Sequence, residues 1–97
     1  MMIVVYKMDK RGTMRCFSAH DMQPSLLGHY ALTVSTTVGE RGGEERMKMF
    51  DSPLEGQEWL LATLALKRKS GYKTLYSWHS GKTLVPQLDR WFNRQAG

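Results

Sequence analysis

The apolar residues of this 97-residue chain change their spacing once, close to residue 51. Before that point, short segments rich in β-branched and aromatic residues alternate with glycine-containing turns, a pattern typical of β-strands and hairpins. After it, apolar residues recur every three or four positions, as on one face of an α-helix. The order predicts an α+β domain: an antiparallel sheet of four or five strands, one main helix packed on one face, and a short C-terminal helix.

Four strands are predicted in the first half of the chain. They cover residues 2–8, 14–22, 29–38 and 44–50. The turn at 9–12 ends in Gly12, which can adopt a positive φ. Residues 23–28 (QPSLLG) are expected to form a loop, and residues 39–43 (GERGG) a turn or short loop. In the fourth strand, we expect Met47 and Met49 to fill the core.

Residues 51–72 carry signals for both ends of the main helix. Ser52 is the expected N-cap and Pro53 the first helical residue, and Glu55 is placed to complete a capping box. Gly71 follows three cations and is the natural residue to end the helix.

The C-terminal part is expected to contain a short strand or loop at 72–82 and an amphipathic helix at 83–95, with Thr83 as a candidate N-cap. The apolar positions of this helix are Leu84, Val85, Leu88, Trp91 and Phe92. The helix either docks on its own domain or contacts a second copy or another protein. We divide the chain into a domain at 1–76 and a C-terminal extension at 77–97.

Composition favours a cytoplasmic protein without a membrane segment. The single cysteine, Cys16, excludes an intrachain disulfide and favours a reducing compartment. The apolar run at the start of the chain ends before Lys7, which is too short for a secretory or membrane segment.

No enzyme activity, metal site or cofactor is predicted. None of the three histidines has a partner at metal-ligand spacing. Ser18, His20 and Asp21 are close in sequence, but we expect alternation along a strand to separate their side chains, which argues against a catalytic triad. The glycines at 39–43 lack the Gly-Lys-Ser/Thr of a phosphate-binding loop.

The net charge of +5 is concentrated in the last third of the chain. Residues 1–66 carry seven Lys/Arg against eight Asp/Glu, a balance of −1, whereas residues 67–97 carry seven against Asp89 alone, a balance of +6. This asymmetry is typical of a polyanion-binding face. The alternative is a solvated helix end and a basic tail. The candidate nucleic-acid-binding residues are Arg41, Arg46, Lys48, Lys67, Arg68, Lys69 and Lys73.

Two groups can be distinguished within this set. Arg46 and Lys48 share one face of a strand, so they could contact neighbouring phosphates of a DNA or RNA backbone. The four cations within residues 67–73 predict salt-sensitive binding that does not depend on nucleotide sequence. Interaction with a protein, without nucleic acid, is the alternative function.

Four features occur in a fixed order between about residues 3 and 73. They are Arg15 and Phe17 in a basic-aromatic strand, MQPSLLGHYAL at 22–32, KMFDSPLEGQEWL at 48–60, and KRKSGY at 67–72. In these features the chain resembles the WGR domain, a small module of bacterial stand-alone proteins and of DNA-dependent poly(ADP-ribose) polymerases. The last three are similar to that family's Q-P-T-L-x-G loop, K-x-F-x-S-x-x-E-A helix start and K-x-x-K-G-Y segment. The resemblance implies a non-catalytic DNA-binding module.

The Trp-Gly-Arg signature of that family is missing from this chain. Ungapped counting places it at residues 36–38 (Thr-Thr-Val), and alignment on Gly39 places it at 35–37 (Ser-Thr-Thr). In the polymerases the tryptophan packs on a sugar at a DNA end, and the arginine contacts the backbone. Threonine provides neither stacking, worth about 1–3 kcal/mol, nor a bidentate contact to phosphate. The resemblance therefore leaves binding to the lysines and arginines.

Overall fold

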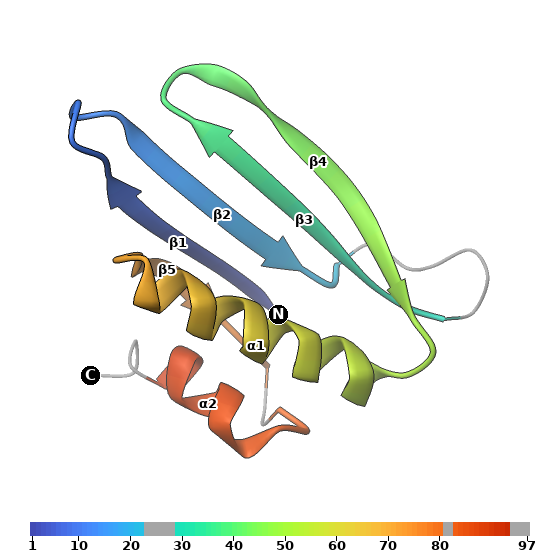
Figure 1. Ribbon diagram of the computed structural model, residues 1–97. Coiled ribbons are helices and arrows are strands. Elements are labelled where there is room, and N and C mark those ends of the chain that lie inside the picture. The colour runs from blue at the N-terminus through green and yellow to red at the C-terminus, as the bar shows by residue number, and fades with distance from the viewer. Residues whose placement is uncertain (23–28, 81–82, 94–97) are drawn as a thin grey trace.

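A computed structural model describes residues 1–22, 29–80 and 83–93, and contains a five-stranded antiparallel sheet and two helices (Figure 1). The strands are β1 (Met2–Met8), β2 (Met14–His20), β3 (Tyr30–Val38), β4 (Arg41–Phe50) and β5 (Lys73–Trp78), and the helices are α1 (Pro53–Lys69) and α2 (Pro86–Asn93). The order across the sheet is β4-β3-β2-β1-β5, so α1 carries the chain from one edge strand to the other. The predicted α+β architecture is confirmed.

One face of the sheet is covered by both helices and holds the core. The buried apolar residues come from the strands (Met1 beside β1, Ile3, Val5, Phe17, Ala19, Leu32), from α1 (Leu60, Leu64), and from α2 and the residue before it (Val85, Leu88, Trp91, Phe92). The predicted boundary at residue 76 falls inside β5, and α2 contributes to the same core as the strands. Thus α2 docks on its own domain.

The opposite face of the sheet, which we call the open face, is covered by neither helix. Strand pairing places on it Met2, Val4, Tyr6, Met47, Met49, Tyr76 and Trp78. Met47 and Met49 are 45% and 43% exposed, so the expectation that they fill the core is wrong. Their strand alternation was assigned correctly, but α1 covers the other face of this edge strand.

Two tight turns lie side by side at one end of the sheet. In the β1–β2 turn, the Asp9 carboxylate accepts hydrogen bonds from the backbone N–H groups of Arg11 and Thr13, both at 2.9 Å, and Gly12 has φ 79°. In the β3–β4 turn, Gly39 has φ 60°, which allows the chain to reverse within two residues. The turn is therefore shorter than the predicted 39–43, because β4 already begins at Arg41. The loop predicted at 23–28 lies outside the described residues.

Both ends of α1 form as predicted. Ser52 Oγ accepts a hydrogen bond from Glu55 N at 3.2 Å. The Glu55 carboxylate bonds Asp51 N at 3.3 Å, one residue before the position of an ideal capping box. At the other end, Gly71 has φ 98°, and the N–H groups of Gly71 and Tyr72 bond the carbonyls of Arg68 and Lys67 at 3.0 Å. This is the Schellman arrangement.

The start of α2 differs from the prediction. The helix begins at Pro86, three residues after Thr83. Thr83 is not an N-cap, because its N–H and hydroxyl donate to the Asp89 carboxylate at 2.8 and 2.7 Å. Leu84 is exposed, and its N–H donates to the buried Gln57 side chain of α1 at 2.7 Å. This bond fastens the segment before α2 onto α1.

Gly56 of α1 lies directly against the Tyr30 ring, and we expect Gly56→Ala to destabilise the fold. A Cβ at this position would stand 2.5 Å from two ring carbons, and the ring is held by a 3.0 Å hydrogen bond from its hydroxyl to Asp21. Overpacking costs about 1–3 kcal/mol, which outweighs the gain in helix propensity of about 1 kcal/mol.

Thermal unfolding measures this effect, with Gly42→Ala as the matched control. A Cβ at Gly42 meets no atom within 4 Å, so that substitution should leave the melting temperature nearly unchanged. A melting temperature for Gly56→Ala equal to or above that of the wild type would contradict the expected clash.

Candidate nucleic-acid interface

A row of cations crosses the sheet at the end where the two turns lie. Lys7 is opposite Arg15, Arg15 is opposite Val38, and Val38 is opposite Arg41. Directly opposed residues of antiparallel strands point to the same face. Lys7 and Arg15 are two positions along their strands from the core residues Val5 and Phe17, so they lie on the helix side, and the Val38 pairing puts Arg41 on the same face.

Cations of the β1–β2 turn and of α1 join this row, and Lys73 of β5, opposite Tyr6 on the open face, lines the adjoining edge of the sheet. We define the basic end as Lys7, Lys10, Arg11, Arg15, Arg41, Lys67 and Lys73, with Asp9 and Glu40 as its two carboxylates. Six of the seven cations, all but Lys67, line two adjoining pockets, and both pockets contain Asp9, Lys10 and Arg15. Seven positive charges against two negative ones leave the basic end with a balance of +5.

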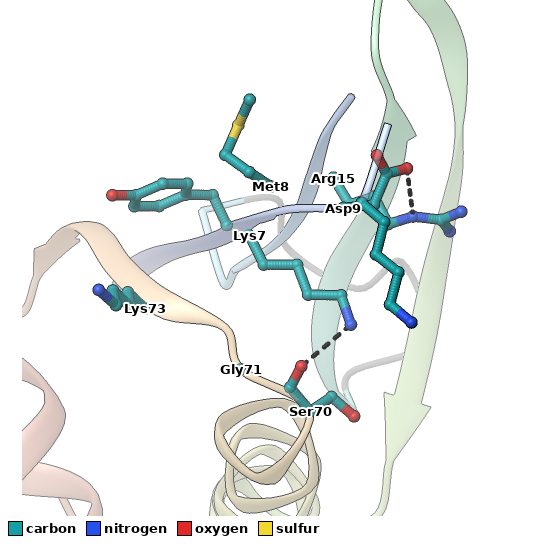
Figure 2. A pocket seen from close by; sticks show the side chains of 9 residues that line it. Lys7, Met8, Asp9, Arg15, Ser70, Gly71 and Lys73 are labelled. Carbon is teal, nitrogen blue, oxygen red and sulfur yellow. Dashed lines mark hydrogen bonds and ion pairs between the residues drawn. The ribbon is translucent and has the colours of Figure 1, made fainter. Parts of the chain in front are cut away.

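Lys7 connects the sheet to the end of α1, as Figure 2 shows. Its Nζ donates to the Ser70 carbonyl at 3.0 Å, which satisfies one acceptor at the helix C-terminus. The Tyr72 ring centre lies 5.2 Å from Lys7 Nζ and 4.9 Å from Lys67 Nζ. Attraction to the ring and to the negative end of the helix dipole offsets the repulsion between the two ammonium groups.

The carboxylates of the basic end do little to neutralise it. Asp9 Oδ2 lies 3.5 Å from Arg15 Nε, and the other Asp9 oxygen is taken up by the backbone of its own turn. The hydrogen bond from Thr13 N–H and the nearby Arg15 charge lower the pKa of Asp9, so it remains ionised. Within the described part of the chain, Arg15 is the one cation of the basic end paired with a carboxylate.

Three of the seven predicted residues, Arg41, Lys67 and Lys73, belong to the basic end. Arg46 and Lys48 do share a face of β4, opposite Val34 and Leu32, as predicted. Lys48 is seven residues beyond Arg41, about 23 Å along an extended strand. These two cations are therefore remote from the basic end.

The remaining predicted cations have other neighbours. Lys48 Nζ is 5.1 Å from the Trp59 ring centre, and Arg68 is stacked 4.1 Å from the Trp91 ring centre, where it covers α2. Lys69 is exposed at the last residue of α1.

Four cations of the basic end were missed from the sequence: Lys7, Lys10, Arg11 and Arg15. They lie in residues 1–66, where the net charge of −1 conceals them. Of the acids that balance them in the sum, Glu58 lies on α1 and Glu45 on the open face, whereas Glu44, opposite Thr36, lies three residues from Arg41 on the helix side. The pairing of Lys7 with Arg15 could have been predicted from the local sequence, because a hairpin with its turn at 9–13 places these two residues opposite each other.

The expected separation of Ser18 and His20 is wrong, because residues two apart in a strand share a face. A triad geometry is nevertheless not formed with Asp21. The Asp21 carboxylate binds the Met1 ammonium at 2.8 Å and the Tyr30 hydroxyl at 3.0 Å, whereas His20 Nδ1 accepts from Met22 N–H at 3.2 Å. Burial, together with the Asp21 charge, raises the pKa of Tyr30 far above its usual value.

The positions that would hold the Trp-Gly-Arg signature lie at the end of β3. Thr36 is opposite Phe17 on the helix side, and Thr37 is opposite Cys16 on the other face. Both positions are within the strand, before the Gly39 turn.

Among residues 1–22, 29–80 and 83–93, no three His, Cys, Asp or Glu side chains gather as metal ligands would. In the same residues, neither helix has the length and apolar character that crossing a bilayer requires.

The chain was also compared with known proteins. No protein-family model, curated protein or solved structure matches it.

Proposed function

We propose that this protein is a non-catalytic module that binds the phosphate backbone of nucleic acid through the basic end. The observation that carries the proposal is the convergence of seven cations from four strands, the β1–β2 turn and α1, at two pockets whose lining includes the carboxylates Asp9 and Glu40. Unpaired lysines and arginines so close together repel one another, and a polyanion removes that repulsion.

The recognition expected from such a site is insensitive to nucleotide sequence. Lysine ammonium groups act as point charges, and the exposed guanidinium groups of Arg11 and Arg41 can contact phosphate through two N–H groups. Binding then gains free energy from the release of counterions.

The proposal includes a WGR-like origin for the module. It is supported by the four ordered sequence features, two of which, Arg15 and the segment at 67–72, contribute cations to the basic end. With threonines at the signature positions, the module would hold DNA without stacking on a terminal sugar. A cytoplasmic location fits the single, half-buried Cys16, which a reducing compartment keeps as a thiol.

A protein partner is the second candidate function, and exposed apolar side chains favour it. Met47, Met49, Tyr76 and Trp78, all on the open face, are between 43% and 50% exposed. The C-terminal helix is less suited to this role than predicted, because its apolar residues are buried in the core. Light scattering of the intact chain tests self-association, since a homodimer would have twice the mass of the monomer.

Titration against labelled oligonucleotides at two salt concentrations tests the nucleic-acid proposal. If four phosphates are contacted, the logarithm of the binding constant should fall with the logarithm of the salt concentration with a slope near −3.6. A fourfold rise in salt should therefore weaken binding to duplex DNA about a hundredfold. An absence of binding to both duplex and single strands at low salt would refute the proposal.

A further inference from the structure

We propose further that the open face along β1 and β5 is a stacking platform for unpaired bases, so that the preferred ligand is single-stranded nucleic acid. This inference rests on the proposed function, since the phosphates of the same strand would occupy the basic end. The platform consists of Tyr6, Tyr76 and Trp78.

Strand pairing places these three aromatic side chains on one face. Trp78 is opposite Met2, Tyr76 is opposite Val4, and Tyr6 is opposite Lys73. The alternate residues Ile3 and Ser77 are buried on the helix side, and the Ser77 hydroxyl donates to the Trp91 carbonyl of α2 at 3.0 Å. The aromatic row therefore faces away from both helices.

The platform is exposed and spaced along the strand. Tyr76 is 50% exposed and Trp78 is 47% exposed. They are two residues apart on β5, about 7 Å in an extended strand. Keeping two large aromatic side chains half in water is unfavourable unless a ligand covers them.

The platform is continuous with the basic end. Tyr6 itself lines the pocket that contains Lys7, Lys10, Arg15 and Lys73. The strands β1 and β5 together carry two lysines and no carboxylate. A chain that places phosphates in this pocket can therefore extend along β5 without meeting a negative charge on either strand.

This combination of chemistry fits unpaired nucleotides better than a duplex. Aromatic side chains beside a positively charged groove bind single strands by stacking on the base faces. In a duplex those faces are stacked on one another and cannot be reached. The other edge of the open face carries Met47 and Met49 but also Glu45, which repels phosphate, so the platform is confined to the β5 side.

Binding of three ligands of equal length tests the inference: a single-stranded oligonucleotide, the same strand with abasic sites, and a duplex. Wild-type protein should bind the single strand about tenfold more tightly than its abasic form. Trp78→Ala and Tyr76→Ala should each weaken single-strand binding about tenfold and leave duplex binding within twofold. Met47→Ala, on the same face and equally exposed, is the matched control and should change neither affinity.

The outcomes separate this inference from the proposed function. Equal affinity of the wild type for the single strand and its abasic form refutes the platform, even if a variant fails to fold. So does equal loss of single-strand and duplex binding in Trp78→Ala. In both cases salt-sensitive binding would still support the basic end, and the open face would be left to a protein partner. If the wild type binds no oligonucleotide, both proposals fail.

Discussion

Replacing Lys10, Arg41 and Lys73 together by glutamate is expected to weaken oligonucleotide binding by a hundredfold or more. All three are exposed residues of the basic end, and none of their side chains makes a hydrogen bond or ion pair that supports the fold among the described residues. Each charge reversal removes one phosphate contact and adds a repulsive charge. The loss of three contacts makes the dependence of the binding constant on salt concentration shallower, by about 2.7 in the log–log slope. Exposed substitutions of this kind change stability by about 0.5 kcal/mol or less.

A control with the same net charge separates a local site from general attraction. Arg46→Glu, Lys48→Glu and Arg90→Glu together change the charge equally but lie outside the basic end. This variant should lose less than about tenfold in affinity, because screening weakens charges beyond about 10 Å. Fluorescence anisotropy at low salt measures both variants. Equal losses in the two would mean that net charge, and not the basic end, governs binding.

Truncating Trp91 is expected to cost about 3–5 kcal/mol of the free energy of unfolding. Its side chain is 5% exposed in the core, and Arg68 stacks on its outer side. Since small domains are stable by only about 5–15 kcal/mol, Trp91→Ala should be close to unfolding. The reason is that α2 is part of the folding unit, although the sequence placed it in an extension.

Urea denaturation measures this loss, and Trp78→Ala provides the comparison within the same chain. Trp78 is 47% exposed, so its removal should cost much less than that of Trp91. Equal midpoints for wild type and Trp91→Ala would show that α2 is not needed for the core, and a chain ending at residue 76 should then fold.

The secondary structure was predictable where a few neighbouring residues determine it. Ser52 and Gly71 end α1 by bonds within four or five residues, and Gly12 allows a turn that Asp9 closes. The start of α2 was not predictable in the same way, because Thr83 donates to the side chain of Asp89, six residues away, and the helix begins only at Pro86.

The basic end was only partly predictable, because most of it depends on strand pairing. The cluster at 67–73 is visible as a local run of charge. Lys7, Arg15 and Arg41 come together only when three hairpin registers are known. The exposure of Met47 was not predictable for a similar reason. The alternation of residues along β4 defines two faces of the strand, and only the position of α1 decides which face is buried.

Amide chemical shifts recorded during a titration with a short single-stranded oligonucleotide at low salt test the basic end most directly. We expect the largest changes at residues 7–15, 39–41 and 67–73. Changes confined to residues 46–50 and Trp59, with the two turns and the end of α1 unaffected, would contradict the basic end as the phosphate-binding surface.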